Sequence, residues 1–191
     1  MRTVVFDIET ANWFGNGGRS ESSDLQIALV GIHDSATDVY DCFLEAELPK
    51  LWKILEQTDI LVGFNSDHFD IPLLNKYYPG DLTNIKSVDL MKEIYDSIGR
   101  RVRLDAVAEG TLGKRKSGHG GQSLVWWRNG EIEKVRAYCQ KDVELTKELY
   151  EYALKYGSLK YRELGALHEI KLNTQKWLAP ESGAMTFTLG F

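Results

Sequence analysis

The sequence predicts an α/β domain in which a mixed sheet of about five strands is flanked by helices. Three observations support this class. Three apolar, β-branched runs come first, and a hairpin-sized link joins the second to the third. Strand-like and helix-like segments then alternate, and helical periodicity dominates after residue 90. Short links are typical of antiparallel strands and alternation is typical of parallel crossovers, so both pairings are expected in one sheet.

Each strand prediction depends on a short apolar run bounded by polar or turn residues. The first run, TVVFDIE, is apolar and β-branched up to Asp7. The second and third runs are separated by the tripeptide DSA, which is short enough for a hairpin. The predicted strands are 3–9, 25–34, 37–44, 59–64 and 85–90.

Each helix prediction depends on apolar residues that recur every three or four positions. In the first helix, Leu48, Leu51, Trp52 and Leu55 share one face, and Pro49 lies in the first turn, where proline is tolerated. Between the last two helices, a Gly-rich basic run over 113–123 predicts a loop. The predicted helices are 47–58, 68–78, 90–98, 103–112 and 132–156.

A change in composition near Gly157 suggests the domain organisation. Residues 1–157 are predicted to form one domain, and residues 158–191, which contain Gly and Pro and lack sustained periodicity, a C-terminal appendage or tail. The final MTFTLGF is apolar and uncharged. It is interpreted as a strand added to the body or, alternatively, as a docking peptide for a partner such as a sliding clamp.

The length and the charge of the chain indicate whether it needs disulfide or metal staples and whether it suits polyanion binding. A chain of 191 residues with 43% hydrophobic residues can bury a core without disulfides or metals as staples. The net charge of −5 argues mildly against a general polyanion-binding protein. However, residues 98–118 hold six Arg or Lys against only Asp105 and Glu109, so the charge distribution matters more than the sum.

Cysteine usage and the N-terminus indicate the cellular setting. Cys42 and Cys139 form neither a metal-binding spacing nor a disulfide framework, so a reducing, cytoplasmic setting is expected. The first seven residues include charges, unlike a signal peptide. No apolar run approaches the ~18 residues that span a bilayer, so no membrane partner is expected.

Two carboxylates, Asp7 and Glu9, lie at the end of the first predicted strand. The two-residue period of a strand puts both on one face. Burying them without a positive partner would cost several kcal/mol per ion. The alternative is that this face of the sheet is open to solvent.

Two further carboxylates interrupt apolar segments. Asp70 begins the helix after the fourth strand, where it or Asp67 could simply cap that helix. Asp142 lies in an apolar stripe of the long helix, one turn after Tyr138, so these two side chains share a face. The alternative partners for Asp142 are Lys141 and Arg136, which fall on other faces of the helix.

Together, Asp7, Glu9, Asp70 and Asp142 form an all-oxygen candidate metal site. Oxygen ligands select hard cations, Mg²⁺ or Mn²⁺. Two such ions about 3.5–4 Å apart stabilise both the attacking and the leaving oxygen in phosphodiester cleavage. The sequence therefore predicts two divalent metal ions as cofactors.

The segments FDIETA, GFNSDHFDIPLL and YCQKD resemble the three motifs of DEDD-superfamily 3′→5′ exonucleases, in the tyrosine-bearing (DEDDy) branch. The Asn-x-x-x-Phe-Asp and Tyr-x-x-x-Asp spacings are intact. The resemblance covers about residues 3–156 and is closest to the proofreading exonuclease domain of family B DNA polymerases and to stand-alone relatives. It implies a ribonuclease H-like fold.

The resemblance also implies roles for the matched residues. Asp7 would bridge both metal ions, Glu9 and Asp142 would complete the site of the ion that activates water, and Asp70 would hold the second ion. Tyr138 would orient the attacking water. The terminal nucleotide would lie against Thr10, Ala11, Asn65 and Phe69.

The implied activity is metal-dependent 3′→5′ hydrolysis of single-stranded DNA that releases nucleoside 5′-monophosphates. RNA stays open as the polymer, because no residue reads or excludes a 2′-hydroxyl. The alternatives are an endonuclease on the same fold and a catalytically silent nucleic-acid-binding module. The intact carboxylates argue against the silent module, because like charges without metal destabilise a fold. No polymerase domain follows, so a polymerase, helicase or clamp would be a partner in trans.

Three other segments have two interpretations. Residues 10–25 form a surface loop or a lip over the site, and the basic residues 114–116 are either solvated or bind phosphate. Trp126 and Trp127 either pack the long helix onto the sheet, which is favoured, or stack on bases.

Overall fold

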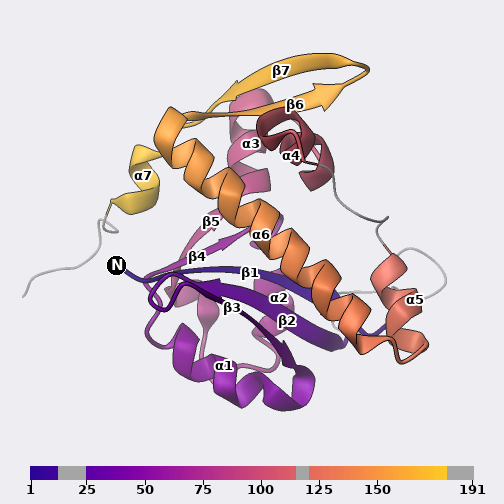
Figure 1. Ribbon diagram of the computed structural model, residues 1–191. Helices are drawn as coiled ribbons and strands as arrows, with labels where there is room; N and C mark the ends of the chain where they lie inside the picture. The colour runs from indigo at the N-terminus through magenta and orange to yellow at the C-terminus, as the bar shows by residue number, and fades with distance from the viewer. Residues whose placement is uncertain (13–24, 115–120, 180–191) are drawn as a thin grey trace, which may run out of the picture.

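The computed structural model describes residues 1–12, 25–114 and 121–179 (Figure 1). Its first half contains strands and short helices in alternation. These are β1 Thr3–Thr10, β2 Ile27–Asp34, β3 Val39–Leu44, the 3-10 turn η2 Glu45–Glu47, α1 Leu48–Leu55, β4 Ile60–Gly63, α2 Asp70–Leu74, the 3-10 turn η3 Leu82–Asn84 and β5 Lys86–Asp89. The second half is mainly helical. It contains α3 Leu90–Ile98, α4 Leu104–Leu112, α5 Gln122–Arg128, α6 Ile132–Tyr156, β6 Ser158–Glu163, β7 Ala166–Lys171 and α7 Gln175–Leu178.

The central sheet has five strands in the order β3-β2-β1-β4-β5. β1 pairs with β2, and β2 with β3, in antiparallel fashion, whereas β1–β4 and β4–β5 are parallel. The predicted α/β class, a mixed sheet of five strands flanked by helices, is therefore confirmed. β1 is the middle strand, so side chains from both neighbouring strands and from the covering helices surround it.

The two faces of β1 meet different helices. Val4, Phe6 and Ile8 belong to one core cluster together with α1 and α2. Val5 belongs to a second cluster together with α3, α4 and α6. By the two-residue period, Asp7 therefore points to the α6 face, over which α6 crosses in Figure 1.

Helix α6 contributes a continuous buried stripe. Val135, Tyr138, Leu145 and Leu149 are buried along it, and Asp142 is buried in the middle of it. The helix ends at Gly157, whose φ of 66° closes the last turn in the left-handed conformation that glycine adopts without strain.

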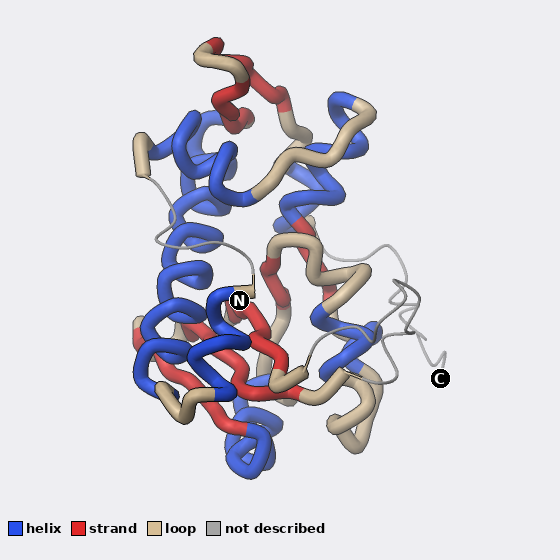
Figure 2. The backbone as a smooth tube through the Cα atoms, turned by 90° about the vertical axis from the view of Figure 1, so that its right-hand side faces the viewer, coloured by secondary structure: helices blue, strands red, loops and turns tan. Residues whose placement is uncertain are grey.

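Residues 158–179 are more ordered than their composition suggests. β6 and β7 form an antiparallel hairpin that packs on α4 and α3, at the top of Figures 1 and 2. Tyr161 of β6 lies so close to Gly110 that a Cβ there would be 2.4 Å from the Tyr161 Cα. Trp177 of α7 is 1% exposed and stacks on Tyr150 at 5.5 Å. The division of the chain at residue 157 stays a prediction, but the described part of the appendage shares the core of α6.

The structure differs from the sequence prediction in two more places. α2 is five residues long instead of eleven, and residues 77 and 78 are not helical. α5 begins within the predicted loop. The interpretations of residues 13–24, of the basic residues 115–116 and of MTFTLGF lie outside the described residues. Of the helices described, none combines the length and apolarity that a membrane crossing requires.

Candidate active site

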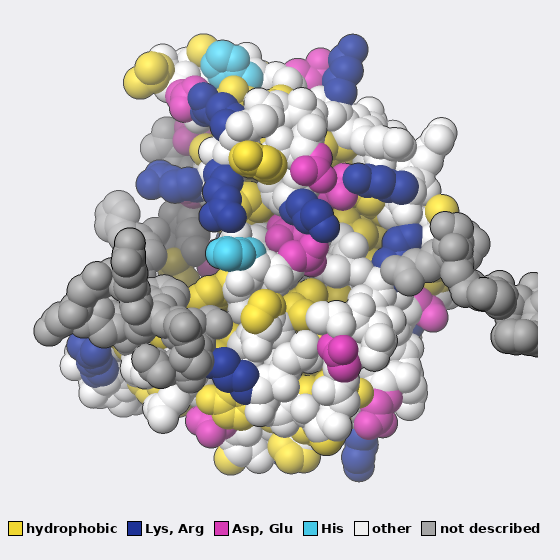
Figure 3. Space-filling model, turned by 180° about the vertical axis from the view of Figure 1, so that it is seen from behind, with side chains coloured by type: hydrophobic (Ala, Val, Ile, Leu, Met, Phe, Trp, Pro, Cys, Tyr) yellow, Lys and Arg dark blue, Asp and Glu magenta, His cyan; other side chains and the backbone are white. Residues whose placement is uncertain are grey.

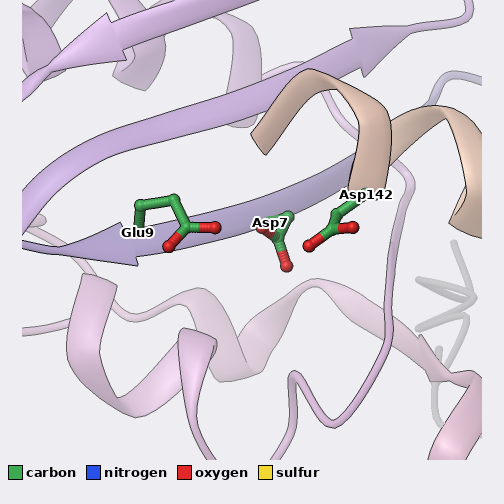
Figure 4. A group of neighbouring side chains, drawn as sticks. All are labelled: Asp7, Glu9 and Asp142. Atoms are coloured by element: carbon green, nitrogen blue, oxygen red, sulfur yellow. The ribbon is translucent and has the colours of Figure 1, made fainter. Parts of the chain in front are cut away.

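Three of the predicted carboxylates converge where β1 passes under α6. One carboxylate oxygen from each of Asp7, Glu9 and Asp142 lies within 4.8 Å of the other two. Figure 4 shows Asp7 between Glu9 and Asp142, with the first two on β1 and the third on α6. Asp142 is buried, whereas Asp7 and Glu9 are half-buried. The opening toward solvent is therefore on the β1 side of the group.

Close packing of β2 against α6 holds this arrangement in place. Gly31 pairs with Asp7 across the β1–β2 ladder, and a Cβ at Gly31 would lie 2.7 Å from the Cys139 sulfur. The Cys139 thiol lies 3.4 Å from the Asp7 carbonyl oxygen and 3.5 Å from Asp7 Oδ2. Burial, followed by the charges of Asp7 and Glu9, raises the pKa of Cys139 well above its usual range. The thiol therefore stays neutral behind the carboxylates.

The cations considered as partners for Asp142 bind elsewhere. Lys141 pairs with Glu144 at 2.9 Å, and Arg136 donates to the Cys42 carbonyl oxygen at 2.7 Å. Glu144, two residues after Asp142, is therefore paired with a lysine and is not part of the carboxylate cluster. A hard divalent cation fits the remaining group, because its donors are all carboxylate oxygens that repel one another without a positive charge.

Asp70 lies beside this group and is not part of the 4.8 Å cluster. Its side chain is buried at the start of α2, and the backbone amides of Ile8 and of Asp70 itself donate to it. Burial raises the pKa of Asp70 well above its usual range, and the charges of Asp89 and Glu9 add to this effect. Neither Asp70 nor Asp67 caps α2 through its side chain, since the N-cap residue is Phe69. Asp67 instead pairs with Lys92 at 3.1 Å.

Asp89 is a buried carboxylate that the sequence analysis missed. It caps α3 by accepting from the amides of Met91 and Lys92, and it also accepts from the amides of Asn65, at 2.7 Å, and Asp67, at 3.1 Å. Asn65 has a φ of 68°, so Asp89 fixes a left-handed residue in the loop that leads to Asp70. Only the N-cap position at the end of β5 could have been recognised from the sequence.

Tyr138 lies one helical turn before Asp142 and is 6% exposed. The Trp126 ring of α5 meets it edge-on, with centroids 5.9 Å apart. Trp126 and Trp127 pack against a small cluster of Leu29, Val135 and Cys139, between the sheet and α6. This agrees with the packing interpretation of the two tryptophans.

The four residues expected to contact the terminal nucleotide lie on two segments. The β1 ladder shifts register between Glu9 and Thr10, and the Ala11 amide then donates to the Gln26 carbonyl oxygen at 2.9 Å. Such bulges re-aim side chains beside active sites. Asn65 and Phe69 lie on the loop between β4 and α2, and both are half-buried. Their role as a nucleotide pocket stays a prediction.

The fold and the site together define an α/β domain with an all-carboxylate candidate metal centre on the central strand of a mixed sheet. A family model of the RNase_H superfamily matches residues 4–154, and the chain belongs to that superfamily. This is the superfamily of RNase H-like nucleases.

A solved structure shows the same fold in a larger protein. The family B DNA polymerase from the hyperthermophilic archaeon Pyrobaculum calidifontis superposes with a TM-score of 0.62 at 21% sequence identity. The match covers 80% of this chain and 24% of the polymerase chain. A comparison with curated proteins found no significant match.

Proposed function

We propose that this protein is a metal-dependent 3′→5′ exonuclease of the DEDDy type that acts on single-stranded DNA ends and releases nucleoside 5′-monophosphates. The observation that carries the proposal is the convergence of Asp7, Glu9 and Asp142 within 4.8 Å, with Asp70 beside them and Tyr138 one turn away. Membership of a nuclease superfamily supports it.

Each group has one task in this proposal. The four carboxylates hold two divalent ions, Mg²⁺ or Mn²⁺, which supply charge stabilisation to the attacking and leaving oxygens of the phosphodiester. The Tyr138 hydroxyl orients the attacking water, and the edge contact from Trp126 limits rotation of the Tyr138 ring. Thr10, Ala11, Asn65 and Phe69 position the terminal nucleotide.

The test is a time course on single-stranded DNA and RNA of one sequence, each labelled at the 3′ or the 5′ end. We expect shortening from the 3′ end of DNA in Mn²⁺ and none in EDTA. Asp7→Asn should lose about 100-fold or more, since metal-based charge stabilisation is worth several kcal/mol. The exposed Asp41→Asn on β3 is the matched control and should cleave like the wild-type protein.

Three results would change the assignment. Internal cuts that need metal and Asp7 would indicate an endonuclease, and shortening of RNA alone would change the polymer. Equal inactivity of the wild-type protein and Asp7→Asn on both polymers would reject catalysis.

Tyr138→Phe keeps the ring and its contact with Trp126 but removes the hydroxyl, so a lower kcat with little change in KM is expected.

A further inference from the structure

A cleft of about 280 Å³ opens between the β4–α2 loop and α3, and it shares only Asn65 with the residues that the proposed function uses. Its walls come from the β4–α2 loop, from the start of α3 and from the α3–α4 connection. The residues that matter for the argument are Asn65, His68, Met91, Lys92, Tyr95 and Arg101.

The cleft adjoins the candidate active site at Asn65 and Asp89. This carboxylate lines the cleft, and it holds the amide of Asn65, which begins the loop leading to Asp70. The charge of Asp89 also acts directly on Asp70, so the two carboxyl groups are neighbours. The cleft therefore lies next to Asp70, on the side of the loop that Asn65 begins.

Among the residues that the structure describes, one cation of the cleft lining is uncommitted. Three arginines lie close together after α3, and two of them are paired: Arg100 with Glu163 at 2.6 Å, and Arg103 with Asp105 at 2.7 Å. Arg101 is exposed, and among the residues that the structure describes it has no hydrogen-bond or ion-pair partner. Its guanidinium is therefore available to a ligand.

The acidic groups of the cleft are already satisfied. Asp67 is paired with Lys92 and accepts from the Ser87 hydroxyl at 2.5 Å, and four backbone amides donate to Asp89. On the face seen in Figure 3, Lys and Arg side chains alternate with Asp and Glu side chains in the upper half of the molecule. Because Asp67 and Lys92 pair with each other and backbone amides hold Asp89, the Arg101 guanidinium is the charged group of the lining that is exposed to a ligand among the residues described.

An aromatic ring lies along the same wall. Tyr95 is 51% exposed and lies one helical turn after Met91 and Lys92 on α3. An exposed ring beside an uncommitted guanidinium is the pair of groups with which proteins bind single-stranded nucleic acid: the ring stacks on a base and the cation binds a phosphate. A site for a small inorganic anion would need only the cation, and the aromatic ring would have no role in it.

We propose that this cleft binds the single strand upstream of the scissile nucleotide, with Tyr95 stacked on a base and Arg101 on a backbone phosphate. The inference rests on the proposed function for the direction of the strand. In this proposal, the substrate strand crosses α3 and continues toward the α3–α4 connection. This path lies at the β5 edge of the sheet, away from β2 and β3.

The test measures binding of fluorescent oligothymidylate to the full chain in EDTA, where cleavage by a metal-dependent enzyme is absent. Arg101→Gln should weaken binding about tenfold at low salt and reduce the slope of log K against log salt by about 0.7, the value for one phosphate of a single strand. Lys53→Gln, on the exposed face of α1, removes the same charge elsewhere and should do neither. Tyr95→Leu should weaken binding about fivefold or more, and Tyr95→Phe should restore it.

The outcomes separate this proposal from the proposed function. If the wild-type protein cleaves DNA but Arg101→Gln and Tyr95→Leu bind as it does, the upstream site is rejected and the exonuclease stands. If the wild-type protein cleaves nothing but these variants lose binding as expected, the exonuclease is rejected and the site stands. Failure of the wild-type protein to bind oligothymidylate rejects the site. Equal losses in Arg101→Gln and Lys53→Gln also reject it, because binding would then follow overall charge.

Discussion

Glu9→Gln should stabilise the metal-free protein and at the same time remove its response to metal. In EDTA, the charge of Glu9 faces those of Asp7 and Asp142 across no more than 4.8 Å. Two unit charges at that distance repel by about 0.9 kcal/mol in water and by about 3.5 kcal/mol at an effective dielectric constant near 20. Glu9 is half-buried, so the lower part of this range applies to each of its two pairs.

We therefore expect the free energy of unfolding to rise by about 1–3 kcal/mol, after allowing about 1 kcal/mol for a lost hydrogen bond. For a chain of this size, 1 kcal/mol shifts Tm by about 2–4 °C. Adding Mn²⁺ at about 100 times its Kd should stabilise the wild-type protein by about 2.7 kcal/mol and should stabilise Glu9→Gln much less.

The assay is thermal unfolding in EDTA and in Mn²⁺. Glu56→Gln, an exposed glutamate at the end of α1, is the matched control and should behave like the wild-type protein in both conditions. The reasoning is refuted if Glu9→Gln melts below the wild-type protein in EDTA. It is also refuted if Mn²⁺ stabilises both proteins equally, because Glu9 would then contribute nothing to metal binding.

Three other predictions concern the frame of the site. Gly31→Ala should lower the free energy of unfolding in urea by about 1–3 kcal/mol, because the new Cβ meets the Cys139 sulfur. Adding Cys139→Ala to the same protein should recover part of that loss. If the stability changes of the two substitutions were strictly additive, the close contact would be contradicted. The Arg2 side chain hydrogen-bonds to Asp34 and lowers the pKa of Asp34, so their pair stabilises the fold above the ordinary carboxyl pKa and loses that contribution as the pH falls through the lower folded-state pKa. Arg2→Gln should therefore be less stable than the wild-type protein at neutral pH and converge with it in acid, and a difference that persists in acid would exclude this linkage. Trp177→Ala should lower the stability of the whole domain by about 3–5 kcal/mol in a single transition, whereas loss of the hairpin alone would show that residues 158–179 unfold separately.

The sequence was most informative where local periodicity decides the outcome. The two-residue period of β1 put Asp7 and Glu9 on one face, and the helical period put Asp142 within an apolar stripe. A buried charge that interrupts an apolar pattern is visible before any tertiary contact is known. The position of the fourth carboxylate, Asp70, depends on where β4 ends, and the end of that strand could also be predicted from the sequence.

The parts that were missed depend on contacts between distant residues. The strands of the β6–β7 hairpin carry charged side chains toward solvent, and the close approach of β6 to α4 depends on Gly110, which leaves room for Tyr161. α5 is too short to be stable alone and is formed against α6, with Gly121 and Gly130 at its two ends. Asp89 looks like an ordinary helix cap, and its hydrogen bonds to the β4–α2 loop span more than 20 residues of sequence.

Met1 and Ala179 line a common cavity at the start of β1. The carboxylates lie further along the same strand, and six residues of extended chain place Asp7 about 20 Å from Met1. A dye, a bead or a glass support attached at Met1 therefore leaves the carboxylates open, which suits single-molecule recordings of one protein on one strand.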